Sequence, residues 1–221
     1  MNPRLIKFLA ASVIFLNVVS PITQAKSVFD KNGKLKFNED GKFKIVQFTD
    51  TQDGPNTDPR TIKLMNNILD KEKPDLVVLT GDNIADGKCT TREDIKKAID
   101  NIAQPMETRN IPWAIVFGNH DTEHNIMTRE EMMKLYMSYP HNISSIGPKN
   151  VDGVGNYNLL INGSKSNKPA FNVYMMDSGS YTTTGIGYYD WIKFSQIQWY
   201  RSTTEELKAK YKKTVPALMF F

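Results

Sequence analysis

Residues 76–83 read Leu-Val-Val-Leu-Thr-Gly-Asp-Asn, an apolar run that ends in a glycine and two polar side chains. The run shows little alternation between apolar and polar residues, which is typical of a parallel strand covered on both faces. Residues 43–54 and 113–121 repeat the pattern, because each begins with an apolar run and ends in a polar cluster. We therefore predict three buried strands, Phe43–Thr49, Leu76–Thr80 and Trp113–Phe117.

Amphipathic segments follow each of these strands. Asp58 precedes Pro59, which predicts a helix start, because Asp caps helices and Pro suits the first helical position. Two further pairs have the spacing of capping boxes and predict helix starts: Thr90 with Glu93, and Thr128 with Glu131. The alternation of strands and helices predicts an α/β fold with mainly parallel βαβ units and right-handed crossovers.

The C-terminal part contains three further β-prone runs and one long helix. The runs are Tyr157–Ile161, Phe171–Met176 and Pro216–Phe221, and Ser195 with Gln198 predicts the helix start between the second and third of them. We see no internal repeat or interdomain linker. The runs from residue 43 to residue 221 are therefore expected to form one domain.

The N-terminus has the pattern of an export signal. Arg4 and Lys7 precede the mostly apolar run Phe8–Val19, and small residues at Thr23 and Ala25 fit a cleavage site. We therefore expect a signal peptide over residues 1–25, with a secreted, periplasmic or cell-surface protein and no stable membrane span after cleavage. An uncleaved N-terminal anchor is the alternative. Residues 26–42 are expected to form a polar lead-in with a short hairpin around Asn32-Gly33.

Composition excludes several classes of function and site. The 221 residues include 28 Lys and Arg and 24 Asp and Glu. Cleavage after Ala25 would remove two basic and no acidic side chains, so the mature chain would be close to neutral, which argues against nucleic-acid binding. A single cysteine, Cys89, excludes an internal disulfide and a cysteine-rich zinc site. Any metal must therefore be held by Asp, Asn, Gln and His.

The polar clusters carry the chemistry. In an open parallel sheet, the carboxyl ends of neighbouring strands face one crevice, so we expect Asp50, Asp82, Asn119 and His120 to converge there. Carboxylate, amide and imidazole groups suit divalent metals such as Mn, Fe or Zn. A carboxylate shared by two such ions would hold a pair that clamps a phosphoryl group.

The three clusters together resemble the signature of the calcineurin-like metallophosphoesterases, which is Asp-x-His, then Gly-Asp, then Gly-Asn-His-Asp/Glu. The details look closest to the exported, purple-acid-phosphatase-like branch, because Gly155-Asn156-Tyr157 and Asp177-Ser178-Gly179 also resemble it. The resemblance covers about residues 43–221. It implies an α/β/β/α sandwich and a phosphoric-ester hydrolase with two divalent metal ions and a phosphate-ester substrate.

The resemblance also implies a role for each matching residue. Asp50 resembles the terminal ligand of one metal, Asp82 the bridging carboxylate, and Asn119 a ligand of the second metal. His120 resembles the group that stabilises the transition state and protonates the leaving oxygen, and Asp121 would orient His120 and raise its pKa. The reaction implied is in-line attack of a metal-bound hydroxide on phosphorus.

The chain departs from the family pattern in two places. Gln52 stands where most of the family has His, so this metal would bind more weakly or prefer oxygen-liking ions such as Mn or Mg. The late histidines that complete both metal shells are unmatched, since the three histidines are His120, His124 and His141. The domain over residues 43–221 is therefore expected to be C-terminally incomplete, with weak metal binding, little activity and an exposed apolar strand surface.

Alternatives remain open at the level of the sequence. The chain could be an inactive relic of this fold, or a protein that binds a phosphorylated ligand without turnover. Asp53 and Asn83 could lie behind the metal ligands or simply form turns, and His124 is interpreted as a solvated loop residue. Tyr188, Tyr189 and Trp191 could line a substrate cleft or pack on the surface. The substrate, metal identity and oligomeric state are not determined by these patterns.

Overall fold

The computed structural model of the chain describes residue 29 and residues 33–221. The expected signal peptide lies outside the described residues, as does Asn32 of the expected hairpin. Phe29 nevertheless pairs antiparallel with Leu35, as that hairpin requires. The elements in chain order are β1 (Ile45–Phe48), α1 (Pro59–Glu72), β2 (Leu76–Thr80), a 3-10 turn (Asp86–Lys88), α2 (Arg92–Glu107), β3 (Trp113–Val116), α3 (Arg129–Tyr136), β4 (Tyr157–Asn162), β5 (Pro169–Met175), α4 (Phe194–Tyr211) and β6 (Ala217–Phe220).

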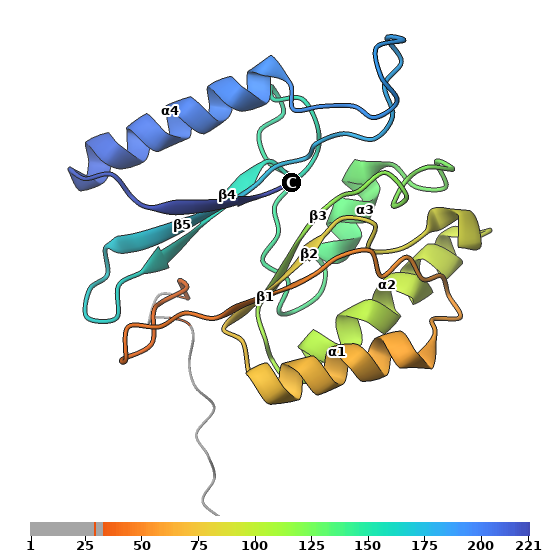
Figure 1. Cartoon of the computed structure of the whole chain (residues 1–221), viewed down its shortest axis with the longest axis horizontal. Coiled ribbons are helices and arrows are strands. Elements are labelled where there is room, and N and C mark those ends of the chain that lie inside the picture. The colour runs from red at the N-terminus through yellow and green to blue at the C-terminus, as the bar shows by residue number, and fades with distance from the viewer. Residues whose placement is uncertain (1–28, 30–32) are drawn as a thin grey trace, which may run out of the picture.

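Two three-stranded sheets form the centre of the molecule. The first has the order β1-β2-β3 and is wholly parallel, as predicted. The second has the order β4-β5-β6 and is mixed, because a short hairpin joins β4 to β5 antiparallel and α4 carries the chain back to a parallel β6. Figure 1 shows α4 outside the second sheet and α1 and α2 on the far side of the first. The predicted α/β/β/α sandwich is therefore confirmed.

The sheets share one core. Trp113 on β3 is fully buried, as are Val173 and Met175 on β5. Tyr157 on β4 connects the sheets directly, because its hydroxyl donates to the Ile115 carbonyl at 2.7 Å and accepts from the Ile115 N–H at 3.2 Å. The second sheet therefore supports the strands that end at the site.

Two of the predicted helix starts are confirmed. Asp58 accepts from Arg60 N at 2.8 Å with Pro59 at the first helical position, and Thr128 with Glu131 forms a capping box. Thr90 is not a cap: it donates to Asp94 Oδ2 at 2.7 Å, and the capping box of α2 pairs Asp94 with Thr91.

The predicted start of α4 is also wrong. The Ser195 hydroxyl donates to Asp152 at 2.5 Å and is not used as a cap. Helix α4 begins at Phe194, where the Lys193 N–H donates to Gln196 Oε1 at 2.7 Å. Ser195 therefore holds α4 against the preceding loop.

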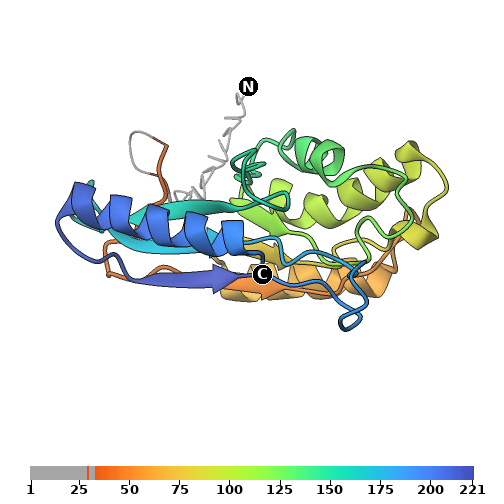
Figure 2. The ribbon, with the colours of Figure 1, turned by 90° about the horizontal axis from the view of Figure 1, so that it is seen from above.

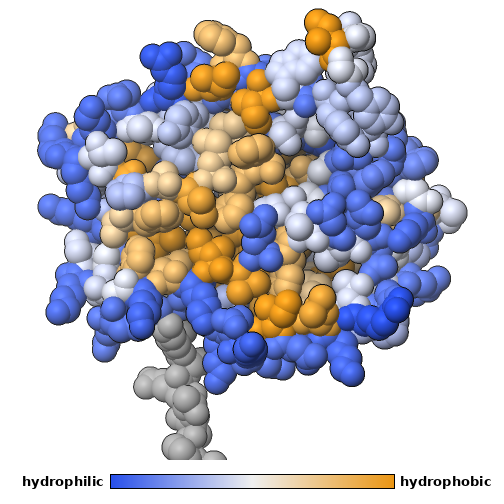
Figure 3. Space-filling model, in the orientation of Figure 1, coloured by the Kyte–Doolittle hydropathy of each residue, from blue (hydrophilic) through white to orange (hydrophobic). Residues whose placement is uncertain are grey.

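The sandwich is open along one edge. Figures 1 and 2 place β1 and β6 on the same side of the molecule, and in the described part of the chain neither strand has a second neighbour. Figure 3 shows apolar side chains gathered on this face. Leu218 is 45% exposed and Phe221 66% exposed, whereas Ile45 and Phe48 are half-buried. An apolar strand edge of this kind is a site for pairing or aggregation.

Candidate functional site

Three loops meet at the carboxyl edge of the first sheet. The strand register sets Phe48 beside Leu79 and Thr80 beside Val116, so the loops that follow start together. Asp50 N donates to Gly81 O at 3.2 Å, and Gln52 N donates to Asp82 O at 3.0 Å. The expectation that polar clusters 70 residues apart in sequence converge is met by the geometry of the backbone.

The backbone of these loops is held in an unusual conformation. Asp50, Gln52 and Asp82 have φ angles of 54°, 44° and 48°. Each left-handed residue other than glycine costs about 1–3 kcal/mol, and such residues cluster at functional sites. Gly118 is required here, because a Cβ at this position would lie 2.2 Å from Asp82 Oδ1.

Asp82 is the central carboxylate of the cluster. Its Oδ1 accepts from His120 N at 2.9 Å, and its Oδ2 accepts from Gln52 Nε2 at 3.1 Å. The position between Gln52 and the Asn119-His120 turn suits the bridging role that the resemblance implies. Asp50 lies on the preceding loop, where Thr49 Oγ1 donates to its Oδ2 at 2.5 Å.

The donor set fits a cation that accepts oxygen ligands. The Asn119 amide nitrogen donates to the Tyr181 hydroxyl at 2.7 Å, which leaves the amide oxygen for a metal. The Gln52 amide nitrogen is likewise used by Asp82, which leaves Oε1. One carboxylate oxygen of the same loops, Asp53 Oδ2, is buried without a hydrogen-bond partner among the described residues. Four oxygen ligands, Asp50, Gln52, Asp82 and Asn119, are therefore available.

The residue that orients His120 is Glu123, not Asp121 as expected. Glu123 Oε2 lies 2.5 Å from His120 Nδ1, and this hydrogen bond is the main reason that the pKa of His120 is raised. The Asp121 carboxylate is buried and accepts from Ile84 N at 3.1 Å and Gly118 N at 2.8 Å. Burial raises the pKa of Asp121 to about 7. Asp121 therefore fixes the loop, and its charge raises the pKa of His120 only slightly.

A second cluster lies beside the first and was not expected. His124 is an exposed loop residue, as predicted, but its Nδ1 lies 3.0 Å from Oδ1 of Asp86, which is a buried carboxylate. Asp86, Glu123 and His124 offer ligand atoms within 4.8 Å of one another. Tyr181 adds to this neighbourhood by donating to Glu123 Oε1 at 2.7 Å. In the sequence, the position of Glu123 three residues after His120 was the one indication that Glu123 could contact the histidine. Nothing in the sequence indicated that Tyr181 would reach the site.

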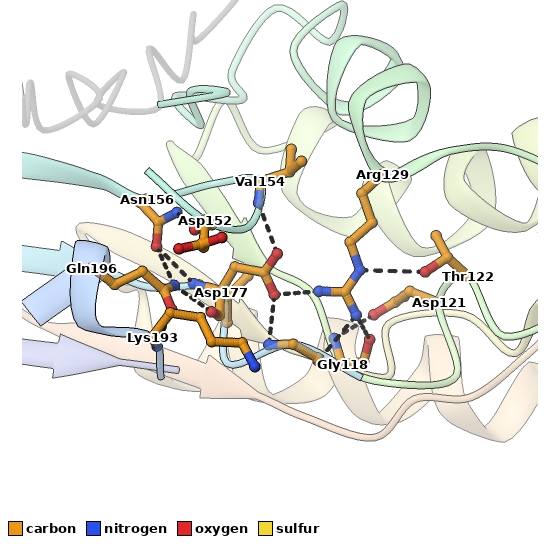
Figure 4. A network of polar contacts seen from close by, with 12 residues as sticks. Gly118, Asp121, Thr122, Arg129, Asp152, Val154, Asn156, Asp177, Lys193 and Gln196 are labelled. Atoms are coloured by element: carbon orange, nitrogen blue, oxygen red, sulfur yellow. Dashed lines mark hydrogen bonds and ion pairs between the residues drawn. The ribbon is translucent and has the colours of Figure 1, made fainter. Parts of the chain in front are cut away.

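A buried ion pair holds the site loop against the second sheet (Figure 4). Arg129 pairs with Asp177 and also donates to Gly118 O at 2.8 Å and Gly179 O at 3.1 Å. Asp177 Oδ2 accepts from Val154 N at 2.7 Å. The Asp177 backbone N–H donates to Asn156 Oδ1 at 3.2 Å, so the two sequence stretches noted above, around residues 156 and 177, meet here.

Comparison with known proteins agrees with this geometry. The family model described as calcineurin-like phosphoesterase matches residues 43–217. Two proteins of Arabidopsis thaliana, "Probable inactive purple acid phosphatase 14" and "Probable inactive purple acid phosphatase 29", are 36% and 35% identical, over 97% and 80% of this chain. "Phosphatase DCR2" of Saccharomyces cerevisiae is 33% identical over 85% of this chain.

The chain spans 62%, 51% and 36% of the length of these three relatives. The matched region nevertheless contains all three strand-end motifs and the loops that bring them together. The chain therefore belongs to the calcineurin-like phosphoesterase family, in its purple-acid-phosphatase-like branch.

Proposed function

We propose that this chain carries the catalytic half-site of an exported, metal-dependent phosphoric-ester hydrolase. The observation that carries the proposal is the position of Asp82, whose carboxylate lies between the Gln52 side chain and the Asn119-His120 turn. Membership in the family supports hydrolysis of phosphoric esters as the type of reaction. The export is proposed from the sequence of residues 1–25 alone. In the part of the chain that the structure describes, no helix is both long and apolar enough to cross a membrane.

The metal ions are proposed to number two, with Asp50 and Gln52 holding one, Asn119 the other, and Asp82 shared. Ions bound there would supply charge at the phosphoryl oxygens and a water nucleophile at neutral pH. The identity of the metals is proposed as Mn, Fe or Zn, with Gln52 favouring the oxygen-liking members.

The protein's own contribution is the protonation of the leaving oxygen by His120. Glu123 accepts from Nδ1, which fixes the ring and leaves Nε2 as the atom that donates to the substrate. Because the hydrogen bond to Glu123 raises the pKa of His120, the donating form persists to higher pH than in a free histidine. Asp82 Oδ1 holds the His120 backbone at the same time.

The second candidate is binding of a phosphorylated ligand with little or no turnover. It is favoured by Gln52, whose amide N–H takes one oxygen of the carboxylate that would bridge the metals. An amide oxygen is also a weaker ligand than imidazole for borderline metals. Two of the relatives carry the word inactive in their names.

One experiment separates the two candidates. Metal content and the turnover of p-nitrophenyl phosphate and bis-p-nitrophenyl phosphate are measured with Mn, Fe or Zn, for the wild type, Asp82→Ala and Gln52→His. Bound metal with turnover that disappears in Asp82→Ala supports the hydrolase. Turnover in Gln52→His alone supports the binding function for the wild type. Turnover that survives in Asp82→Ala refutes the site.

A further inference from the structure

A hairpin of aromatic residues stands beside the site. Residues 180–190, here called the aromatic hairpin, fold back on themselves through two backbone hydrogen bonds, Thr182 N to Tyr188 O at 3.1 Å and Asp190 N to Ser180 O at 2.9 Å. Its tip contains Gly185 and Gly187, both with positive φ. Figure 1 shows this segment projecting from the body of the molecule, as the blue loop between β5 and α4.

Three tyrosine rings of the hairpin form a compact group. The Tyr181 and Tyr189 rings are stacked at 25° with centroids 5.8 Å apart. The centroid of the Tyr188 ring lies 5.1 Å from that of Tyr181 and 5.0 Å from that of Tyr189, and both pairs are edge to face. Tyr188 and Tyr189 remain 68% and 60% exposed, so the hairpin presents aromatic faces to solvent. Rigid, exposed aromatic rings are common at binding sites.

Tyr181 connects this group of rings to two residues of the site, Asn119 and Glu123. The Tyr181 hydroxyl accepts from the Asn119 amide and donates to Glu123, both at 2.7 Å. Glu123 is also the residue that holds His120 Nδ1. Tyr188 and Tyr189 therefore lie one ring away from a proposed metal ligand and from the residue that orients the proposed acid.

The foot of the hairpin is also held firmly. Lys193 pairs with Asp190 and lies over the Trp191 ring at 4.1 Å. At the other side of the foot, the Gly179 carbonyl accepts from Arg129. The rings are thus presented on a braced element, which lowers the cost of ordering them when a ligand binds.

We propose that the aromatic hairpin is the subsite for an aromatic leaving group of the phosphate ester, such as a nucleoside or an aryl group. The proposal rests on the proposed function for the position of the phosphoryl group. His120 would protonate the leaving oxygen, so the leaving group would lie next to His120. From there it would extend toward the neighbouring surfaces, and the tyrosine rings form one of them. Base or aryl stacking on Tyr188 or Tyr189 supplies the affinity.

The test compares two probes that share a phosphate and a ribose but differ in the base. Binding of adenosine 5′-monophosphate and ribose 5-phosphate to the full chain is measured by titration calorimetry with manganese present. We expect adenosine 5′-monophosphate to bind about tenfold tighter or more, which corresponds to the stacking of one base. The double variant Tyr188→Ala/Tyr189→Ala should reduce this preference to about twofold, with the affinity for ribose 5-phosphate unchanged.

Two control variants sharpen the result. Tyr188→Phe/Tyr189→Phe keeps the rings and should keep the preference. Tyr211→Ala removes a tyrosine at the opposite end of α4, away from the hairpin, and should have no effect. Equal affinities for the two probes, no binding of either, or a preference that survives in the double alanine variant would each overturn the proposal. If the wild type prefers adenosine 5′-monophosphate but binds no metal and hydrolyses no ester, the proposed hydrolase is refuted while the aromatic subsite is not.

Discussion

Arg129 is a residue outside the site whose removal should be costly. Its side chain is 13% exposed and its guanidinium pairs with Asp177, whose side chain is 2% exposed. The same guanidinium donates to the carbonyls of Gly118 and Gly179, which belong to the site loop and to the foot of the aromatic hairpin. The substitution Arg129→Met keeps an apolar stem similar to that of arginine, although the side chain is shorter, and it removes the charge and the donors.

The expected loss follows from the burial of the partner. After Arg129→Met, the Asp177 carboxylate keeps its hydrogen bonds from Val154 N and Gly179 N but has lost the cation that pairs with it. An uncompensated buried charge of this kind costs about 3–5 kcal/mol of unfolding free energy. Adding Asp177→Asn removes the orphaned charge. The double variant should therefore lose less than the sum of the single variants, by about 2 kcal/mol.

A surface pair provides the matched control. Arg92 Nη2 lies 2.8 Å from Glu131 Oε1, but the two side chains are 53% and 40% exposed. Arg92→Met should therefore cost about 0–1 kcal/mol. The assay is urea unfolding followed by circular dichroism, with EDTA present so that metal binding does not contribute. If Arg129→Met costs no more than Arg92→Met, or if the losses of the double variant are additive, the ion pair does not hold the loops together as argued.

Three further predictions concern the site. Asp82→Ala should lower the turnover of bis-p-nitrophenyl phosphate by orders of magnitude, because it removes the shared ligand; a rate near that of the wild type contradicts the assignment. Glu123→Gln should move the alkaline decline of the pH–rate profile to lower pH, because the hydrogen bond that raises the pKa of His120 is weakened; an unchanged profile would return the orienting role to another residue. For Asp121, burial raises the pKa from 3.8 to about 7, so the folded state binds more protons than the unfolded state between these pH values. The unfolding free energy of the wild type should therefore fall by up to about 4 kcal/mol as the pH rises through this window, and Asp121→Asn should lack this fall in urea unfolding at each pH.

The position of the site was predictable because it depends on sheet geometry. Parallel neighbouring strands end at one edge, so Asp50, Asp82 and Asn119 had to meet once the three strands were recognised. The second sheet was less predictable, since β5 pairs with β4 by a hairpin and with β6 by a crossover. A run of apolar residues does not distinguish these two connections.

The partner of His120 could not be read from the sequence for a different reason. Asp121 is adjacent to His120, but consecutive residues in a tight turn point in different directions. The Asp121 carboxylate is engaged by the N–H groups of Gly118 and Ile84. Glu123 reaches Nδ1 because the turn brings it round, and Tyr181 reaches Glu123 across 58 residues of sequence. Such contacts depend on loop conformation, which residue spacing does not specify.

The hydrogen bonds of the site also explain how the loops can keep their shape with glutamine at position 52, where most of the family has histidine. Asp82 would carry an unneutralised charge in a cluster of carboxylates, but it accepts from the His120 backbone and from the Gln52 amide. Imidazole at position 52 would bind a metal more strongly, whereas the amide supplies a donor to Asp82 and an oxygen to a metal. The loops are further held by the buried Asp121 carboxylate and by Arg129. The arrangement of the strand ends therefore rests on protein contacts, and exchange of a single ligand should alter metal affinity and turnover far more than the fold.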